Sequence, residues 1–191
     1  MKKNKCIFLD RDGTINVYKC LLHKKDDLIL EEKAAEAIKM INNSEYLCIV
    51  VSNQPVVARN ICTLQDVWEI NKKLEELLHR ANGAYLDDIF ICPHHPDKGY
   101  PEENKEFKIQ CDCRKPKIGM IKKAAEKHNI DLSKSFIIGD TTIDIMTGIN
   151  AGLKTILVKT GLGGTDNKYN VKPDYVAENL LEAIEYIIGG C

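Results

Sequence analysis

Phe8-Leu9-Asp10-Arg11-Asp12-Gly13-Thr14 is the stretch of this chain that decides its fold. The residues from Cys6 to Leu9 form a short apolar run that predicts a buried strand, and two aspartates follow at its end. Ligands of open α/β sheets bind at the carboxyl ends of the strands, and alternation along an extended chain turns Asp10 and Asp12 the same way. The pattern predicts one carboxylate as a nucleophile and the other as a general acid or base, with a metal ion reducing their repulsion.

The rest of the chain alternates short apolar runs with amphipathic ones. Runs rich in Ile, Val, Leu or Phe predict strands at 5–10, 46–52, 88–92, 135–140 and 154–159. Helical spacing of apolar residues predicts helices at 31–42, 64–80, 118–128, 143–150 and 177–188, with Thr63 as an N-cap and Asp66 three residues on. This alternation is typical of an α/β fold with a doubly wound parallel sheet. An Asp-x-Asp pair alone could be a solvated turn, but at a strand end in such a sheet the functional interpretation is favoured.

Length and net charge limit the number of domains and the kinds of partner that we expect. The 191 residues suit one domain, 1–191, and the net charge of −1 gives no general attraction to nucleic acid or membranes. No apolar run approaches the length of a membrane-spanning helix, and the run behind the basic N-terminus is too short for a signal peptide. We therefore expect a cytoplasmic protein with no nucleic-acid or membrane partner, and take a monomer as the default.

Polar residues also end the second and fourth predicted strands. Ser52, followed by Asn53 and Gln54, is suited to hold a phosphoryl oxygen, although Ser-Asn-Gln is also a common turn. Asp140 follows Gly139 and should reach the same sheet edge as the first two carboxylates, which predicts a magnesium site. Asp144 is expected to cap the helix that begins near Ile143.

A long polar loop, 93–116, interrupts the alternation and carries the features of a metal clip. Three thiols and one imidazole give the closed ligand set of a structural zinc: Cys92, His94, Cys111 and Cys113. The alternative is reduced, unpaired cysteines with a surface histidine, which would leave so long a loop unexplained. His95 is expected to face solvent or substrate. Arg114 and Lys115 follow at once and supply cations for a phosphate.

Together these motifs resemble those of the haloacid dehalogenase-type phosphohydrolases over nearly the whole chain. The resemblance implies a Rossmann-like sheet, and the short segment after the first motif leaves no room for a cap domain. It implies Asp10 as nucleophile and Asp12 as general acid/base, with Asp10, the Asp12 carbonyl and Asp140 binding Mg²⁺. It also implies contacts with phosphate or substrate from Thr14, Asn16, Ser52, Asn53, Gln54, Arg59, Arg114 and Lys115.

Cys-Pro-His-His-Pro at 92–96 and Cys-Asp-Cys-Arg-Lys-Pro at 111–116 are similar to the D-glycero-D-manno-heptose 1,7-bisphosphate 7-phosphatases. Their relatives, the histidinol-phosphate phosphatases, share the zinc clip in a shorter loop, so the loop over 92–113 favours the heptose branch. The resemblance implies a structural Zn²⁺, a catalytic Mg²⁺ and a sugar bisphosphate substrate. Removal of its 7-phosphate would leave heptose 1-phosphate for nucleotide activation and use in lipopolysaccharide or capsule.

Two segments depart from the family pattern. Tyr18 and Cys20 replace an expected Asp and Gly in a loop that should face the sugar, and Pro55 to Asn60 keeps only Ala58-Arg59 of the usual sequence. Histidinol phosphate would need an acidic group for its amine, and none is evident. A zinc-stabilised binding protein on an inactive phosphatase fold is the non-enzyme alternative. A nucleotide phosphotransferase is disfavoured because no Gly-x4-Gly-Lys-Ser/Thr loop occurs.

Overall fold

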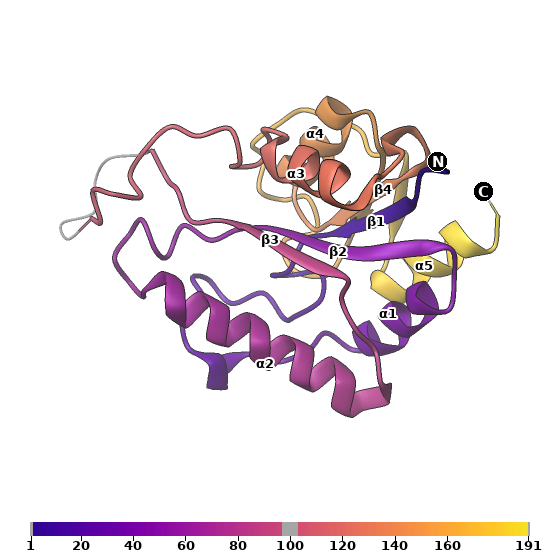
Figure 1. Ribbon diagram of the computed structural model, residues 1–191, viewed down its shortest axis with the longest axis horizontal. Coiled ribbons are helices and arrows are strands. Elements are labelled where there is room, and N and C mark those ends of the chain that lie inside the picture. The colour runs from indigo at the N-terminus through magenta and orange to yellow at the C-terminus, as the bar shows by residue number, and fades with distance from the viewer. Residues whose placement is uncertain (1, 97–102, 191) are drawn as a thin grey trace.

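A computed structural model describes residues 2–96 and 103–190 of the chain, so part of the predicted zinc loop lies outside the described residues. Within them, one parallel sheet has the strand order β3-β2-β1-β4-β5-β6 (Figure 1). The strands are β1 (Lys5–Leu9), β2 (Tyr46–Asn53), β3 (Asp88–Cys92), β4 (Phe136–Gly139), β5 (Lys154–Val158) and β6 (Tyr175–Ala177). The helices are α1 (Ala34–Asn42), α2 (Leu64–Asn82), α3 (Gly119–His128), α4 (Thr142–Ala151) and α5 (Leu180–Ile188), with short 3-10 helices η1 (Lys25–Asp27) and η2 (Leu132–Lys134).

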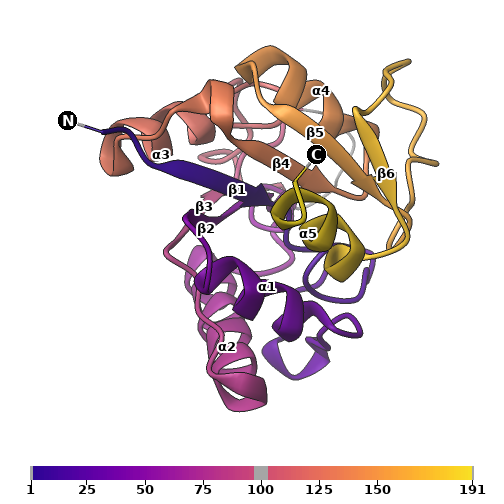
Figure 2. The same cartoon turned by 90° about the vertical axis from the view of Figure 1, so that its right-hand side faces the viewer.

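Helices cover both faces of the sheet (Figures 1 and 2). Successive residues of β1 point to opposite faces, so Ile7 and Leu9 lie in one apolar cluster and Cys6 and Phe8 in the other. The first cluster also contains the buried side chains of α1, α2 and α5, and the second those of α3. The predicted α/β fold with a doubly wound parallel sheet is therefore confirmed.

The predicted strands are all present, with ends shifted by at most one residue. Two predicted helix starts are wrong. The helix expected from residue 31 begins at Ala34, and the one expected from 177 begins at Leu180, behind an Asn179 N-cap that accepts a hydrogen bond from the Glu182 amide. Residues 175–177 instead form β6, a three-residue edge strand too short to show a sequence period.

Capping boxes stabilise the N-termini of α2 and α4. Thr63 and Asp66 form the predicted cap of α2. At α4 the N-cap is Thr141, and Asp144 occupies the third helical position, where its carboxylate accepts from the Thr141 backbone N–H. Asp144 thus takes part in capping the helix, as predicted, although the N-cap residue is Thr141 and Asp144 lies in the first turn.

The strand order places β1 and β4 side by side in the middle of the sheet, with later connections running outward in opposite directions. Such a switch point leaves a crevice at the carboxyl ends of the two strands. Between β1 and α1 the chain forms loops and η1, with no added domain, so the predicted absence of a cap domain is confirmed. None of the helices in the described ranges is both long and apolar enough to cross a bilayer.

Candidate active site

The crevice between β1 and β4 brings two carboxylates together. Asp10 follows the last residue of β1, and Asp140 follows the last residue of β4. Gly13 and Gly161 have φ values of 81° and 59°, and a Cβ on either would collide with the Asp140 carboxylate. Glycine is therefore required at both positions, by backbone conformation and by space.

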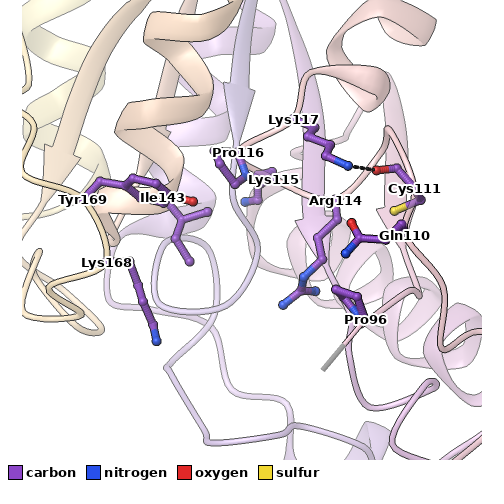
Figure 3. A pocket seen from close by; sticks show the side chains of 10 residues that line it. All are labelled: Pro96, Gln110, Cys111, Arg114, Lys115, Pro116, Lys117, Ile143, Lys168 and Tyr169. Atoms are coloured by element: carbon purple, nitrogen blue, oxygen red, sulfur yellow. Dashed lines mark hydrogen bonds between the residues drawn. The ribbon is translucent and has the colours of Figure 1, made fainter. Parts of the chain in front are cut away.

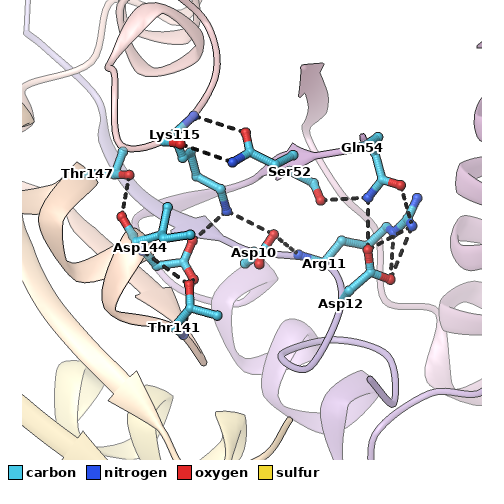
Figure 4. Close-up of polar contacts among 11 residues, drawn as sticks. Asp10, Arg11, Asp12, Ser52, Gln54, Lys115, Thr141, Asp144 and Thr147 are labelled. Carbon is cyan, nitrogen blue, oxygen red and sulfur yellow. Dashed lines mark hydrogen bonds and ion pairs between the residues drawn. The ribbon is translucent and has the colours of Figure 1, made fainter. Parts of the chain in front are cut away.

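Lys115 connects this pair to a third carboxylate. Its Nζ lies 2.9 Å from Asp10 Oδ1 and 2.5 Å from Asp144 Oδ1, and the lysine is buried (Figure 4). Burial alone would lower the pKa of Lys115, but the two carboxylate charges outweigh it and raise the pKa. Asn53, at the end of β2, holds the lysine backbone: its amide accepts from Lys115 N at 3.0 Å and donates to Lys115 O at 3.2 Å.

Asp12 points into a separate polar network. Arg11 NH2 donates to both of its carboxylate oxygens, at 3.1 and 2.9 Å, and Gln54 donates at 2.8 Å (Figure 4). Asn16 donates to the same carboxylate at 3.0 Å. Burial alone would raise the pKa of this carboxyl, but the Arg11 charge and the surrounding hydrogen bonds lower it below its usual value. Gln54 also donates to Ser52 Oγ at 2.9 Å and so links Asp12 to the end of β2.

The carboxylates of Asp10, Asp140 and Asp144 offer oxygens that lie within 4.8 Å of one another. Oδ1 of Asp140 is buried with no hydrogen-bond partner among the described residues. Burial, with the charges of Asp10 and Asp144, raises the pKa of Asp140 to about 8, and burial raises the pKa of Asp10 to about 6 although Lys115 opposes it. Crowded carboxylates with a free buried oxygen suit a hard divalent cation. Asp144 joins this group, whereas the Asp12 carboxylate does not.

The predicted zinc ligands also come together. Cys92 Sγ lies 3.6 Å from Cys111 Sγ and 3.1 Å from Cys113 Sγ, and His94 Nδ1 lies 3.7 and 3.3 Å from the sulfurs of Cys92 and Cys113. Ligand atoms around a tetrahedral zinc are separated by roughly 3.5–3.8 Å, a range that contains two of these distances, while the two that involve Cys113 are shorter. Three sulfurs and one imidazole gathered in this way are a donor set that suits the ion. Arg114 NH1 donates to His94 O at 3.1 Å, which ties the cation-bearing segment to the cluster.

Two hollows lie near the cluster. One, of about 150 Å³, is lined by Asp10, Asp12, Ser52 and Asp140 among others. The other, of about 460 Å³, includes Lys115 in its lining, and the described residues that line it comprise four cations and no carboxylate (Figure 3). Its charged lining residues are Arg114, Lys115, Lys117 and Lys168.

One expectation in this region is corrected, and the others stay predictions. Thr14 and Asn16 are fully buried, and the Asn16 amide donates to Asp12 and Val17 O. Thr14 Oγ1 and Asn16 Oδ1 have no hydrogen-bond partner among the described residues, and their substrate contacts stay predictions. His95 does not face solvent: it is buried, with Nε2 3.5 Å from Arg59 NH2. Arg59 is half-buried beside it, and its predicted phosphate contact stays a prediction.

Two residues of this region were not expected from the sequence. Arg11 stands between the two aspartates, and its position inside the motif was the available signal. Lys168 lies in the second hollow because Asp166 and Tyr169, on either side of it, bond to Thr142 at the start of α4.

Comparison with known proteins agrees with this geometry. A protein-family model described as HAD-hydrolase-like matches residues 112–183. A crystal structure of D,D-heptose 1,7-bisphosphate phosphatase from B. bronchiseptica, complexed with magnesium and phosphate, matches with a TM-score of 0.84 and 28% identity, covering 98% of this chain and 99% of that one. The fold and site thus define a haloacid dehalogenase-like hydrolase.

Sequence relatives narrow the class further. D-glycero-beta-D-manno-heptose-1,7-bisphosphate 7-phosphatase of Haemophilus ducreyi is 36% identical over 96% of this chain and 98% of its own length. D-glycero-D-manno-heptose-1,7-bisphosphate 7-phosphatase of Chlorobaculum tepidum is 37% identical over 99% of this chain and 97% of its own. The chain belongs to the family of D-glycero-D-manno-heptose-1,7-bisphosphate 7-phosphatases.

Proposed function

We propose that this chain is a Mg²⁺-dependent phosphatase that removes the 7-phosphate of D-glycero-D-manno-heptose 1,7-bisphosphate and leaves heptose 1-phosphate. The observation that carries the proposal is the cluster at the end of β1. Asp10 lies 2.9 Å from Lys115 Nζ and lines one hollow, and Lys115 is one of the cations that line the second hollow. Family membership supports the substrate, because the relatives named above act on this bisphosphate.

Asp10 is the nucleophile in this proposal. Its Oδ1 accepts from Arg11 N at 2.8 Å and from Lys115, which leaves Oδ2 to attack phosphorus. The bond from phosphorus to the 7-oxygen breaks, and Asp10 carries the phosphoryl group. Asp12 gives that oxygen a proton, which requires its carboxyl to be protonated when substrate is bound: Arg11 opposes this, and the negative charge of the substrate phosphate favours it. Asp12 then takes a proton from the water that attacks the aspartyl-phosphate, and free phosphate leaves.

The neighbouring residues hold the charge of the phosphoryl group. Ser52 lines the catalytic hollow, and Lys115 brings a buried ammonium to it, kept in place by Asn53. Asp10, Asp140, Asp144 and the Asp12 carbonyl are the groups that would hold Mg²⁺. When bound, Mg²⁺ offsets the negative charge of the carboxylates and the phosphoryl oxygens.

The zinc clip has a structural role in this proposal. Cys92 ends β3, whereas Cys111 and Cys113 directly precede Arg114 and Lys115. A zinc ion held by the cluster would tie the two cations to the sheet edge.

The second hollow would take the far end of the substrate. The described residues of its lining bring four cations, which suits the 1-phosphate better than the amine of histidinol phosphate. Lys168 is the cation there with no hydrogen bond or ion pair to any described residue. We therefore assign Arg114 and Lys168 to the phosphate that is not removed.

The remaining assignments follow from this reaction. Heptose 1-phosphate is a substrate for nucleotide activation, so a place in lipopolysaccharide or capsule synthesis is proposed. The free thiols of the described cysteines favour the reducing cytoplasm. A single domain over 1–191 and a monomeric state stay predictions.

Phosphate release with Mg²⁺ tests the function. The panel holds the α and β anomers of heptose 1,7-bisphosphate, fructose 1,6-bisphosphate and histidinol phosphate. We expect one heptose anomer to be strongly preferred. Preference for histidinol phosphate would overturn the substrate assignment, and no release from any compound would favour the inactive-phosphatase alternative.

A further inference from the structure

Asn71 is a polar residue on the apolar face of α2, and the reaction above gives it no role. It is 1% exposed and shares that face with Val67 and Leu74. Its Oδ1 accepts from Arg11 NH1 at 2.9 Å, but its Nδ2 has no partner among the described residues. A buried amide with an unpaired donor costs stability, so packing alone would favour an apolar side chain here. The bond to Arg11 is the one feature that explains the asparagine.

Arg11 is held on every edge of its guanidinium. Nε and NH2 face Asp12, NH2 also donates to Gln54 Oε1 at 3.0 Å, and NH1 donates to Asn71 (Figure 4 shows all but the last). The guanidinium is fully buried, and its donors have a fixed planar arrangement. Asn71 therefore sets the orientation of the edge that binds Asp12.

Asp12 is the last residue in this chain of hydrogen bonds and the one that faces the proposed substrate site. Its side chain is 20% exposed, and it lines the catalytic hollow. The contacts thus run from the middle of α2, through one buried cation, to the carboxylate that exchanges protons in the proposed reaction.

We propose that Asn71 is a positioning residue, which orients Arg11 so that Asp12 lies in reach of the reacting oxygens. The inference rests on the proposed function, because Asp12 matters only if phosphoryl transfer occurs at Asp10. A group that exchanges a proton must lie within hydrogen-bond reach, and a displacement of about 1 Å can cost on the order of 10²-fold in rate. Asn71 touches no substrate, so its effect belongs in kcat rather than in KM.

The test compares Asn71→Leu with the unaltered protein, using p-nitrophenyl phosphate and the heptose bisphosphate. We expect kcat to fall on the order of ten-fold, with KM within about two-fold. Asn71→Asp keeps an acceptor oxygen for Arg11 and should recover most of kcat. If Asn71→Leu does not fold, Asn71→Ala takes its place.

Two controls separate positioning from packing. Ile70→Val alters a fully buried neighbour on the same helix and leaves every hydrogen bond of Arg11 in place, so it should keep kcat unchanged. In an Arg11→Lys background, where the planar fork is gone, Asn71→Leu should cause no further loss.

Unchanged kcat in folded Asn71→Leu would overturn the inference. It would also be overturned if Asn71→Leu lowered kcat by the same factor in the Arg11→Lys background as in the unaltered protein. Turnover of p-nitrophenyl phosphate without turnover of the heptose bisphosphate would overturn the substrate assignment and leave the positioning test in force. No turnover of either compound by the unaltered protein would overturn both the proposed function and this inference.

Discussion

Lys115 lies between two carboxylates, and this placement governs the charge of the candidate site. With Asp140 close by, three acidic side chains surround one ammonium. Burial, together with the negative charge of the neighbouring carboxylates, disfavours ionisation and raises the pKa values of Asp10 and Asp140. A substrate phosphate would add to this charge, so a cation is needed as well as the lysine.

Asp10→Asn should abolish turnover while the fold is kept. The amide has nearly the same shape as the carboxylate but cannot attack phosphorus. Phosphate release and the thermal midpoint are the measurements. Continued release at a substantial rate would show that another group is the nucleophile.

Lys168→Ala should raise KM for the bisphosphate by roughly three- to ten-fold, because one charged contact with the second phosphate is lost. The KM for p-nitrophenyl phosphate, which has no second phosphate, should not change. Lys172→Ala removes an exposed lysine from the same connection and is the matched control. Equal effects of the two variants would mean that only general charge is involved.

Single residues differed in how far they could be predicted. Asp10 and Asp140 end apolar runs, so their meeting at one sheet edge followed from the pattern. The contact of Arg11 with Asn71 joins residues far apart in the chain, and no local period shows which buried polar groups will face each other. The burial of Thr14 and Asn16 in the turn after β1 was not predictable for a related reason.

Among the elements, the connection between β3 and α3 depends most on its ligands. Its described part contains no regular element before α3, and the four predicted zinc ligands lie at its two ends. Few backbone hydrogen bonds hold such a loop, so a metal ion would contribute much of its order.

Cys111→Ser should lose zinc, lower the thermal midpoint and reduce activity, because the segment with Arg114 and Lys115 loses its anchor. Cys20→Ser, which alters an exposed cysteine outside the cluster, is the control. Metal content and thermal unfolding are measured on both. A Cys111→Ser protein with unchanged midpoint and full activity would make the cysteines incidental.

Thr63→Ala should destabilise the protein by about 1 kcal/mol, the usual contribution of an N-cap side chain. Thr63 Oγ1 accepts from the Asp66 amide at 3.1 Å at the start of α2. Thr63→Ser keeps this acceptor and should stay close to the unaltered stability. Denaturant unfolding gives the comparison, and equal midpoints for all three proteins would contradict it.

At the scale of the whole molecule, the sheet was the most predictable feature. Five strands have apolar runs long enough to identify, and parallel pairing follows from the helices between them. The edge strand β6 has only three residues and gave no such signal. Helix starts were less certain because capping residues can lie one turn from where the apolar period begins.

Mg²⁺ should stabilise the whole fold. An ion that binds the native carboxylate group but not the unfolded chain adds about 2.7 kcal/mol at a concentration of 100 Kd. The thermal midpoint should therefore rise with added MgCl₂, and much less so in Asp140→Asn. Equal shifts in both proteins would mean that the ion acts elsewhere.

The strand order also bears on how the protein is made. β1 is the first strand to leave the ribosome, yet it lies in the centre of the sheet and pairs with β4, which begins at Phe136. During synthesis one edge of β1 stays unpaired until most of the chain has emerged, and an unpaired strand edge is prone to non-native pairing with other strands. A nascent chain halted before residue 136 would hold Asp10 in an unfinished sheet, so catalytic competence is gained late in translation and all at once.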